Sequence, residues 1–164
     1  MDALTAIAAR HSTRAYTSKT IPKAILEKIA DAGRRAATAR NVQPWEFVIV
    51  MEAETRKELA DLAEYGKFIA QAPACIAVFC QDTKYYLEDG CAATQNMLIA
   101  ATALGVQSCW VAGDKKPYCG AIADVLKVPA GYKLISLVAL GYAEDPGRPT
   151  PKRSLADVIH WEKF

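Results

Sequence analysis

Two short basic clusters stand near opposite ends of the 164-residue chain, and their residue types suit binding of an anion. The first contains Arg10, Ser12 and Arg14, and the second is Lys152-Arg153. Arginine presents a rigid fork of N–H donors that matches phosphate oxygens, and a serine hydroxyl adds another donor. Alternate residues of an extended segment point to one side, so the first cluster can converge on a single phosphate. Each cluster alone is weak evidence, because surface arginines are commonly solvated.

A second candidate for binding is the loop of residues 41–45, in which two amides, Asn41 and Gln43, precede Pro44 and Trp45. Amide groups offer donor and acceptor edges, and proline with tryptophan makes the loop stiff. These properties suit recognition of a planar heteroaromatic ring. A turn that leads into a strand, with Trp45 in the core, accounts for the same residues equally well.

Several other chemistries are disfavoured by what the sequence does not contain. Neither G-x-G-x-x-G nor a Walker-type phosphate loop is present. With only two histidines, neither a metal site nor a serine triad is expected. The five cysteines are scattered and never spaced as Cys-x-x-Cys, so we expect reduced, buried thiols. A redox role for Cys109 or Cys119 is the alternative.

The composition is that of an ordinary single domain covering residues 1–164, with 52% hydrophobic and 23% charged residues. A net charge of +2 is too small to indicate a nucleic-acid partner or a membrane surface. No apolar run reaches the length of a membrane span, which is about 20 residues, and no signal-peptide pattern opens the chain. The sequence therefore predicts a cytoplasmic protein with neither nucleic acid nor a membrane among its partners.

The elements that must position these clusters alternate between helical and strand patterns, which predicts an α+β domain. Helices are expected at residues 3–9, 22–37, 54–64, 89–104 and 119–126, and strands at 47–50, 74–80, 107–111 and 134–142. Pro22 should open the second helix, with Ser18 or Thr20 near its N-cap. The helix at 89–104 is apolar on several sides, as in a central or interface helix, and Gly105 should end it in a left-handed conformation.

The final segment, residues 143–164, differs from the rest of the chain. Three prolines at 146, 149 and 151 disfavour regular structure, and a capped mini-helix with apolar residues at 155, 158 and 159 follows. We expect an arm that docks on a partner subunit. An arm that folds back on its own domain is the alternative.

Six segments, taken together and in order, closely resemble the nitroreductase family of FMN enzymes, and specifically its short branch. They are Arg10-His11-Ser12-Thr13-Arg14, Asn41-x-Gln43-Pro44-Trp45, residues 89–97, residues 104–110, residues 139–142 and Lys152-Arg153. The resemblance covers the whole chain. It implies a central mixed or antiparallel sheet flanked by helices, a C-terminal arm around the partner subunit, and a homodimer with FMN at the subunit interface.

The resemblance also assigns roles to individual positions. It places the FMN phosphate at the first motif and at the late basic pair, and a backbone N–H near the flavin N5 atom at Ala112-Gly113. The loop before Pro44 would approach the flavin of the other subunit. The cofactor-binding residues implied are Arg10, His11, Ser12, Arg14, Thr38, Ala39, Asn41, Ala112, Gly113, Lys152 and Arg153. Weaker candidates are Gln43, Gln95 and Asn96, of which the last two could simply cap or pack a helix. A contact to the pyrimidine edge would fall near residues 65–68.

Two departures from the family pattern bear on these roles. Ala37-Thr38 stands where many relatives have Pro-Ser, so a hydroxyl remains but the restraint of proline is lost. Ala112 stands where some relatives have glutamate, which leaves a backbone donor intact.

The activity implied is transfer of two electrons from NAD(P)H to nitroaromatics, quinones or similar conjugated acceptors by a ping-pong mechanism. No acid–base side chain is required, because the flavin carries the chemistry. Three alternatives remain: a specialised flavin reaction such as dehalogenation, a flavin-binding or sensing module, and a cofactor-free α+β interaction domain.

Overall fold

The computed structural model describes residues 1–145 and 147–164 and contains one four-stranded antiparallel sheet. Its strands are β1 (Trp45–Val50), β2 (Ala74–Gln81), β3 (Gln107–Ala112) and β4 (Tyr132–Gly141). They lie in the order β1-β2-β4-β3, so β1 and β3 form the two edges. At the β3 edge, Ser12 forms an isolated parallel bridge with Ser108. The sheet is therefore antiparallel, with one parallel bridge added by the N-terminal segment.

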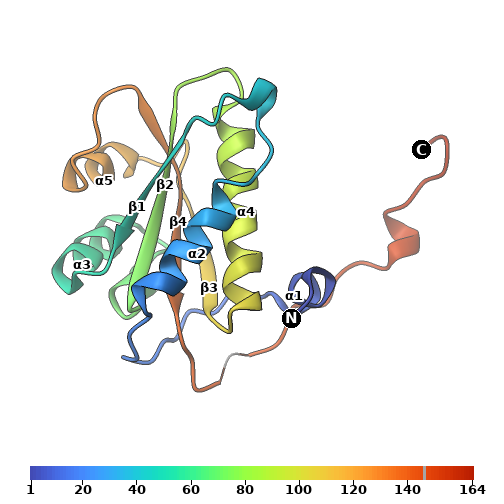
Figure 1. Cartoon of the computed structure of the whole chain (residues 1–164), viewed down its shortest axis with the longest axis horizontal. Helices are drawn as coiled ribbons and strands as arrows, with labels where there is room; N and C mark the ends of the chain where they lie inside the picture. Colours follow the sequence, from blue (N-terminus) through green and yellow to red (C-terminus); the bar gives the residue numbers. More distant parts are fainter. Residues whose placement is uncertain (146) are drawn as a thin grey trace.

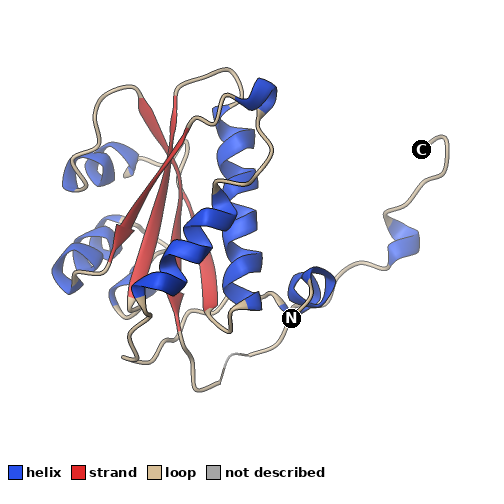
Figure 2. Cartoon of the chain, in the orientation of Figure 1, coloured by secondary structure: helices blue, strands red, loops and turns tan. Residues whose placement is uncertain are grey.

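Helices cover both faces of this sheet (Figures 1 and 2). They are α1 (Ala3–Ala9), α2 (Lys23–Gly33), α3 (Ala53–Leu62), α4 (Tyr86–Ala103) and α5 (Cys119–Val125). The long helix α4 packs on the sheet and contacts α1 and α2, whereas α3 and α5 lie together on the opposite face. The described residues also form three short 3-10 turns: η1 (Ala39–Asn41), η2 (Lys67–Ala70) and η3 (Leu155–Asp157).

The central strand β2 explains why the sequence contains a continuous apolar run there. Ile76 and Val78 belong to the core on the α4 side, whereas Ala77 and Phe79 belong to the core on the α3 side. Because both faces of the strand are covered, alternation of polar and apolar residues is absent, and burial is complete from Ala74 to Cys80. The α+β prediction is confirmed.

The ends of the elements depart from the predictions in places. The second helix ends at Gly33 rather than residue 37, because its last turn tightens into bonds from Arg35 N to Ala32 O and from Ala36 N to Gly33 O. Its N-cap is Pro22, which has no side-chain cap, so the expected cap by Ser18 or Thr20 is wrong. Gly105, after α4, has a φ of +74°, which confirms the left-handed end.

All five cysteines are free, and burial is the first cause of a raised pKa at each thiol. Cys109, which was a redox candidate, is 2% exposed. A raised thiol pKa disfavours the reactive thiolate. Cys75, Cys80 and Cys109 are buried, as expected, whereas Cys91 and Cys119 are partly exposed.

These thiols should make the stability of the fold fall in alkaline solution. Burial raises the pKa of Cys75 and of Cys80 to about 12, from an ordinary value of 9.0. The unfolded chain loses these protons at a lower pH than the folded chain does. The contribution of the protonated thiols to the free energy of unfolding is therefore complete below about pH 9. It is lost as the pH rises toward 12, by about 1.4 kcal/mol per pH unit per thiol. Urea unfolding from pH 8 to 11 under reducing conditions measures this slope. Cys75→Ala should have a smaller slope than the parent, and an unchanged slope would contradict the prediction.

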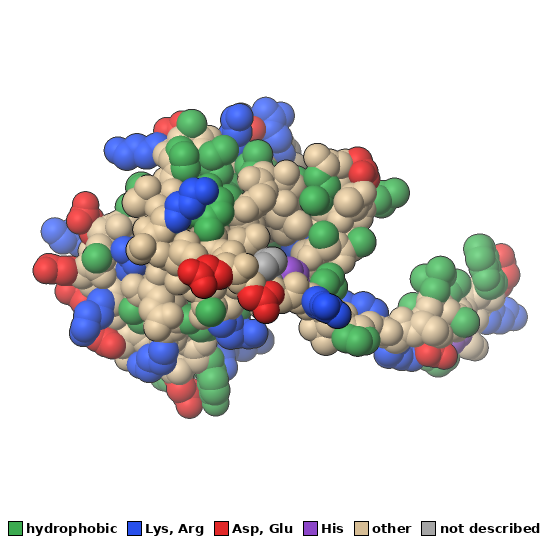
Figure 3. All heavy atoms as spheres, turned by 90° about the horizontal axis from the view of Figure 1, so that it is seen from below, with side chains coloured by type: hydrophobic (Ala, Val, Ile, Leu, Met, Phe, Trp, Pro, Cys, Tyr) green, Lys and Arg blue, Asp and Glu red, His purple; other side chains and the backbone are tan. Residues whose placement is uncertain are grey.

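The C-terminal tail projects away from the domain (Figure 1). Every residue from 147 to 164 is exposed, including Leu155 at 71% and Trp161 at 83%. Hydrophobic side chains are distributed along this projection in Figure 3. The mini-helix is present as η3, and the Ser154 hydroxyl accepts the Asp157 N–H at 3.3 Å. The side chains of residues 147–164 are therefore not buried against their own domain, although Pro149, Thr150 and Lys152 line a hollow together with residues of that domain.

Candidate functional site

The two basic clusters, which lie about 140 residues apart in sequence, meet in one hollow of about 580 Å³. Arg10 and Ser12 line it from one side, and Lys152 reaches it from the tail. The remaining lining residues are Ile7, Ala8, Gln95, Leu98, Trp110, Pro149 and Thr150. The Thr13 N–H donates to the Ser108 carbonyl at 3.0 Å, which fixes the first cluster against β3. The arrangement offers two cations and a hydroxyl to a single anion. We call it the phosphate hollow.

Arg14 does not line the phosphate hollow, so joint binding of one anion by Arg10, Ser12 and Arg14 stays a prediction. Arg14 lines a second hollow of about 460 Å³, where its guanidinium stands 6.0 Å from the centre of the Phe68 ring. Trp110 lines both hollows, which therefore adjoin. We call the second one the aromatic hollow.

Two further members of the basic motifs do not line the phosphate hollow. The Arg153 guanidinium instead donates to the Asp157 carbonyl at 2.6 Å, within the arm. His11 Nδ1 lies 2.9 Å from the Ala9 carbonyl and therefore donates to it, which makes this ring nitrogen the protonated one. In this chain, Lys152 is the member of the late basic pair that faces Arg10.

A backbone N–H donor is expected at Ala112 or Gly113, and the structure favours Ala112. The Gly113 N–H already donates to the Ile135 carbonyl at 2.9 Å. Along an antiparallel ladder the hydrogen-bonding direction alternates, so the Ala112 N–H points away from β4 toward the open edge of the sheet. Ala112 is exposed and lines the aromatic hollow. Its carbonyl accepts the Tyr118 hydroxyl, which fixes the following turn.

Glycine is required at position 113 for packing. A Cβ there would lie 2.6 Å from the Leu134 carbonyl oxygen and 2.7 Å from the Ile135 carbonyl oxygen, both of which belong to the β4 backbone. We expect Gly113→Ala to lower the free energy of unfolding by about 1–3 kcal/mol, because backbone cannot move aside as a side chain can. Urea denaturation measures this loss. Gly120→Ala is the control, since a Cβ there meets nothing within 4 Å, and equal effects of the two changes would contradict the interpretation.

The loop with Thr38, Ala39 and Asn41 lies at the N-terminal end of α4, away from the phosphate hollow (Figure 1). The Ala39 N–H donates to Asp89 in the first turn of α4 at 3.2 Å, whereas the phosphate hollow uses Gln95 and Leu98. Nine residues of helix separate Asp89 from Leu98, or about 14 Å. A single chain therefore does not bring this loop to the phosphate hollow.

This loop also holds an unusual backbone. Arg40, Asn41 and Gln43 all have positive φ, at 53°, 56° and 51°. Such conformations cost energy for residues other than glycine and cluster at functional sites. The Thr38 hydroxyl accepts the Gln43 N–H at 3.2 Å and supports the turn. Asn41 and Gln43 are exposed, so they are accessible to another molecule.

The two weaker candidates on α4 have different surroundings. Gln95 lines the phosphate hollow, but the Asn96 amide donates to the Ala32 carbonyl at 3.1 Å and so packs α4 on α2. Three residues that line the aromatic hollow, Glu64, Trp110 and Lys116, have no role assigned from the sequence, whereas Tyr65, Lys67 and Phe68 belong to the segment near which a contact to the pyrimidine edge is expected. Lys116 follows Ala112-Gly113 closely in the sequence. This proximity was the one signal by which the sequence could have identified it.

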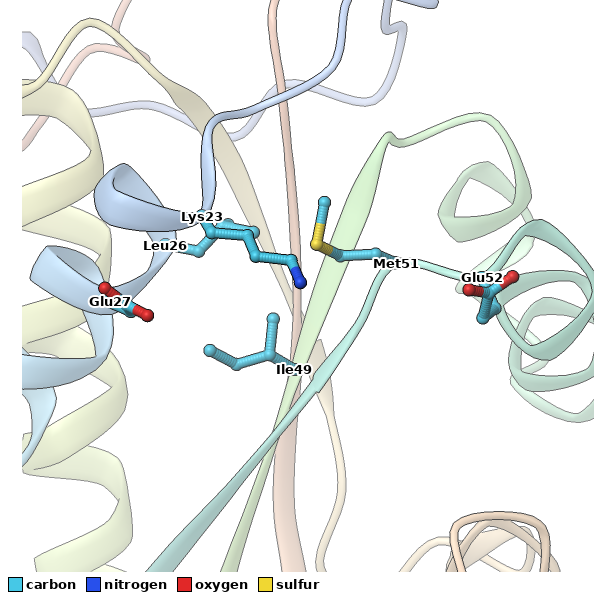
Figure 4. A pocket seen from close by; sticks show the side chains of 6 residues that line it. All are labelled: Lys23, Leu26, Glu27, Ile49, Met51 and Glu52. Atoms are coloured by element: carbon cyan, nitrogen blue, oxygen red, sulfur yellow. The ribbon is translucent and has the colours of Figure 1, made fainter.

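A further hollow, of about 340 Å³, lies between α2 and β1 and is shown in Figure 4. Its lining side chains are Lys23, Leu26, Glu27, Ile49, Met51 and Glu52. It collects none of the residues predicted to bind a cofactor. Among residues 1–145 and 147–164, no three histidine, cysteine or acidic side chains group as metal ligands. Over the same residues, no helix has the length and apolarity needed to cross a bilayer.

Comparison with known proteins identifies the family of the chain. Residues 2–163 match the family model described as "Putative TM nitroreductase". A protein of Archaeoglobus fulgidus, named "Putative NADH dehydrogenase/NAD(P)H nitroreductase", is 32% identical over 173 residues, covering 99% of each chain.

Solved structures with the same fold include one from Bacteroides thetaiotaomicron that carries the same name. It has a TM-score of 0.94 and 27% identity and covers 99% of this chain and 98% of its own. An FMN-dependent nitroreductase from Clostridium difficile has a TM-score of 0.88, with 98% and 99% coverage. At 24% identity, the second match supports the fold alone.

Proposed function

The chain belongs to the nitroreductase family, and we propose that it is an FMN-dependent oxidoreductase that acts as a homodimer. We propose further that it passes two electrons from NAD(P)H to nitroaromatics, quinones or similar conjugated acceptors in a ping-pong cycle. The observation that carries this proposal is the phosphate hollow, where Arg10, Ser12 and Lys152 meet. A cytoplasmic location fits a reductase that draws on NAD(P)H.

The residues present fit FMN at the two adjoining hollows. Arg10, Ser12 and Lys152 supply donors for a phosphate, as the chemistry of a phosphomonoester requires. Arg14 and Trp110 supply a cation and an aromatic surface for a planar ring that becomes negative when reduced. The open-edge N–H of Ala112 is a backbone donor that needs no particular side chain. When bound, FMN would supply the two-electron chemistry.

A homodimer explains why one chain supplies only part of the site. Thr38, Ala39 and Asn41 lie at the far end of α4 and would contact the flavin of the partner subunit. The exposed arm carries Leu155, Val158 and Trp161, which need a surface to cover them. Docking of the arm on the partner would bury these side chains. The two sites would then depend on assembly.

The test is a visible absorption spectrum of the purified protein, followed by anaerobic addition of NADH and, separately, NADPH. We expect a flavin spectrum that bleaches and then returns on addition of a nitroaromatic or a quinone. A flavin that never bleaches would favour a binding or sensing module. A flavin that bleaches but is reoxidised by neither acceptor would favour a specialised reaction such as dehalogenation. A colourless protein that does not bind added FMN would overturn the proposal.

A further inference from the structure

We propose that Lys116 and Tyr65 form a recognition site for the carboxylate of a planar aromatic acceptor, at the mouth of the aromatic hollow. This inference rests on the proposed function and names the class of acceptor that the same site prefers. Lys116 is not among the residues assigned to FMN, whereas Tyr65 begins the segment near which a contact to the pyrimidine edge is expected. The argument uses the walls of the hollow, its charges and the rigidity of the turn that carries Lys116.

The walls of the aromatic hollow suit a flat ring. Tyr65, Phe68, Trp110 and Tyr118 contribute four aromatic side chains to a space of about 460 Å³. Tyr65 is 71% exposed, so its ring stands at the mouth rather than in the core. An exposed aromatic side chain next to a hollow is available to stack on a ligand. The flavin ring is proposed to lie in the same hollow beside Arg14 and Trp110, so the exposed Tyr65 ring at the mouth is the surface left for a planar aromatic acceptor.

The charges of the hollow favour an anion. Its lining contains three cationic side chains, Arg14, Lys67 and Lys116, and one carboxylate, Glu64. Lys67 is already engaged, because its Nζ donates to the Asp61 carbonyl at 2.9 Å. In the described part of the chain, no carboxylate lies within 4.0 Å of the Arg14 or Lys116 cation. Arg14 is assigned to the cofactor, which leaves Lys116 as the unneutralised cation.

Lys116 and Tyr65 already face each other across the mouth. The Lys116 Nζ lies 5.9 Å from the centre of the Tyr65 ring. This separation is near the outer limit of a cation–π contact, so the attraction is weak and a ligand can replace it. A carboxylate beside Nζ and a ring against Tyr65 would use both groups at once.

The turn that carries Lys116 is held firmly at both ends. The N–H groups of Gly113 and Asp114 donate to β4 at 2.9 and 2.8 Å. The Tyr86 hydroxyl donates to Asp114 Oδ1 at 2.8 Å, and the Tyr118 hydroxyl donates to the Ala112 carbonyl. These bonds hold Lys116 close to Ala112 and limit the conformational entropy lost when a ligand binds.

The adjacent lysine provides a matched control. Lys115 has the same charge and is also exposed, but it lines a different hollow together with Cys119 and Lys133. Changing either lysine to glutamine removes one positive charge from the same turn. A long-range effect of net charge would appear in both variants, whereas direct recognition would appear in one.

The experiment compares 2-naphthoate with 2-naphthylmethanol, which share a planar ring but differ in charge, as ligands that cannot be reduced. Their dissociation constants from FMN-loaded dimer are measured by calorimetry. We expect the parent protein to bind the carboxylate more tightly, and Lys116→Gln to weaken carboxylate binding about fivefold, the upper range for an exposed ion pair. Alcohol binding should not change, and Lys115→Gln should match the parent for both ligands. Raising the salt concentration should reduce the preference.

A second variant tests the ring contact separately. Tyr65→Leu should weaken binding of both ligands by a similar factor, because it removes the aromatic surface and keeps the lysine. Equal effects of Lys116→Gln on carboxylate and alcohol, or equal effects of Lys115→Gln and Lys116→Gln, would overturn the proposal. Failure of the protein to take up FMN would instead overturn the proposed function, so the two failures are distinguishable.

Discussion

Replacing Arg10 with alanine is expected to raise the dissociation constant for FMN by about 10- to 100-fold. Arg10 lines the phosphate hollow together with Ser12 and Lys152. Hydrogen bonds to a charged group contribute about 1.5–3 kcal/mol, and about 1.4 kcal/mol corresponds to a factor of ten in affinity. Titration of FMN into apoprotein, followed by quenching of flavin fluorescence, measures the change.

Riboflavin, which lacks the phosphate, provides the control ligand. If Arg10 acts on the phosphate, Arg10→Ala should bind riboflavin as well as the parent protein does. Arg35→Ala is the control variant, since Arg35 is an exposed residue just after α2 that pairs with Asp31. A loss of affinity that is the same for FMN and riboflavin would show that Arg10 supports the fold of the site rather than the anion.

The elements of the fold were predictable because local sequence determines them. The run from Ala74 to Cys80 is apolar throughout, and only a strand covered on both faces matches this pattern. Gly105 predicted the end of α4 correctly, because a left-handed residue is favoured there. The end of α2 was less predictable, since residues 34–37 have acceptable helix propensity and the tightening of the last turn depends on the surrounding fold.

The site was predictable only in part, because its geometry is tertiary. The meeting of Arg10 with Lys152 followed from the resemblance to a family, and neither cluster indicated it alone. The division of Arg10 and Arg14 between two adjoining hollows was not predicted, because it depends on how the N-terminal segment lies against β3. The sequence also did not reveal that the Gly113 N–H is already hydrogen-bonded, because this depends on pairing with Ile135 of β4. The role of Lys116 requires the facing Tyr65, about 50 residues earlier in the sequence.

Ending the chain at Ser154 is expected to convert the dimer into a monomer and to release most of the FMN. The truncation removes the exposed apolar side chains of the arm, Leu155, Val158, Ile159, Trp161 and Phe164. None of the removed residues is buried in its own domain, and Lys152 and Arg153 are retained, so the fold and the phosphate hollow should persist. Burial of one such side chain contributes about 1.5–3 kcal/mol. The dimer dissociation constant should therefore rise by at least about 100-fold.

Light scattering across a range of protein concentrations, with flavin absorbance recorded on the same samples, measures assembly and FMN content together. Glu162→Gln in the full chain is the matched control, because it alters the arm without removing an apolar side chain. A truncated protein that stays dimeric would show that the arm is not what holds the subunits together. A truncated monomer that keeps its FMN would contradict the proposal that Thr38, Ala39 and Asn41 of one subunit contact the flavin of the other. Loss of both properties together is the result expected if each flavin site requires loop 38–41 of one subunit and the phosphate hollow of the other.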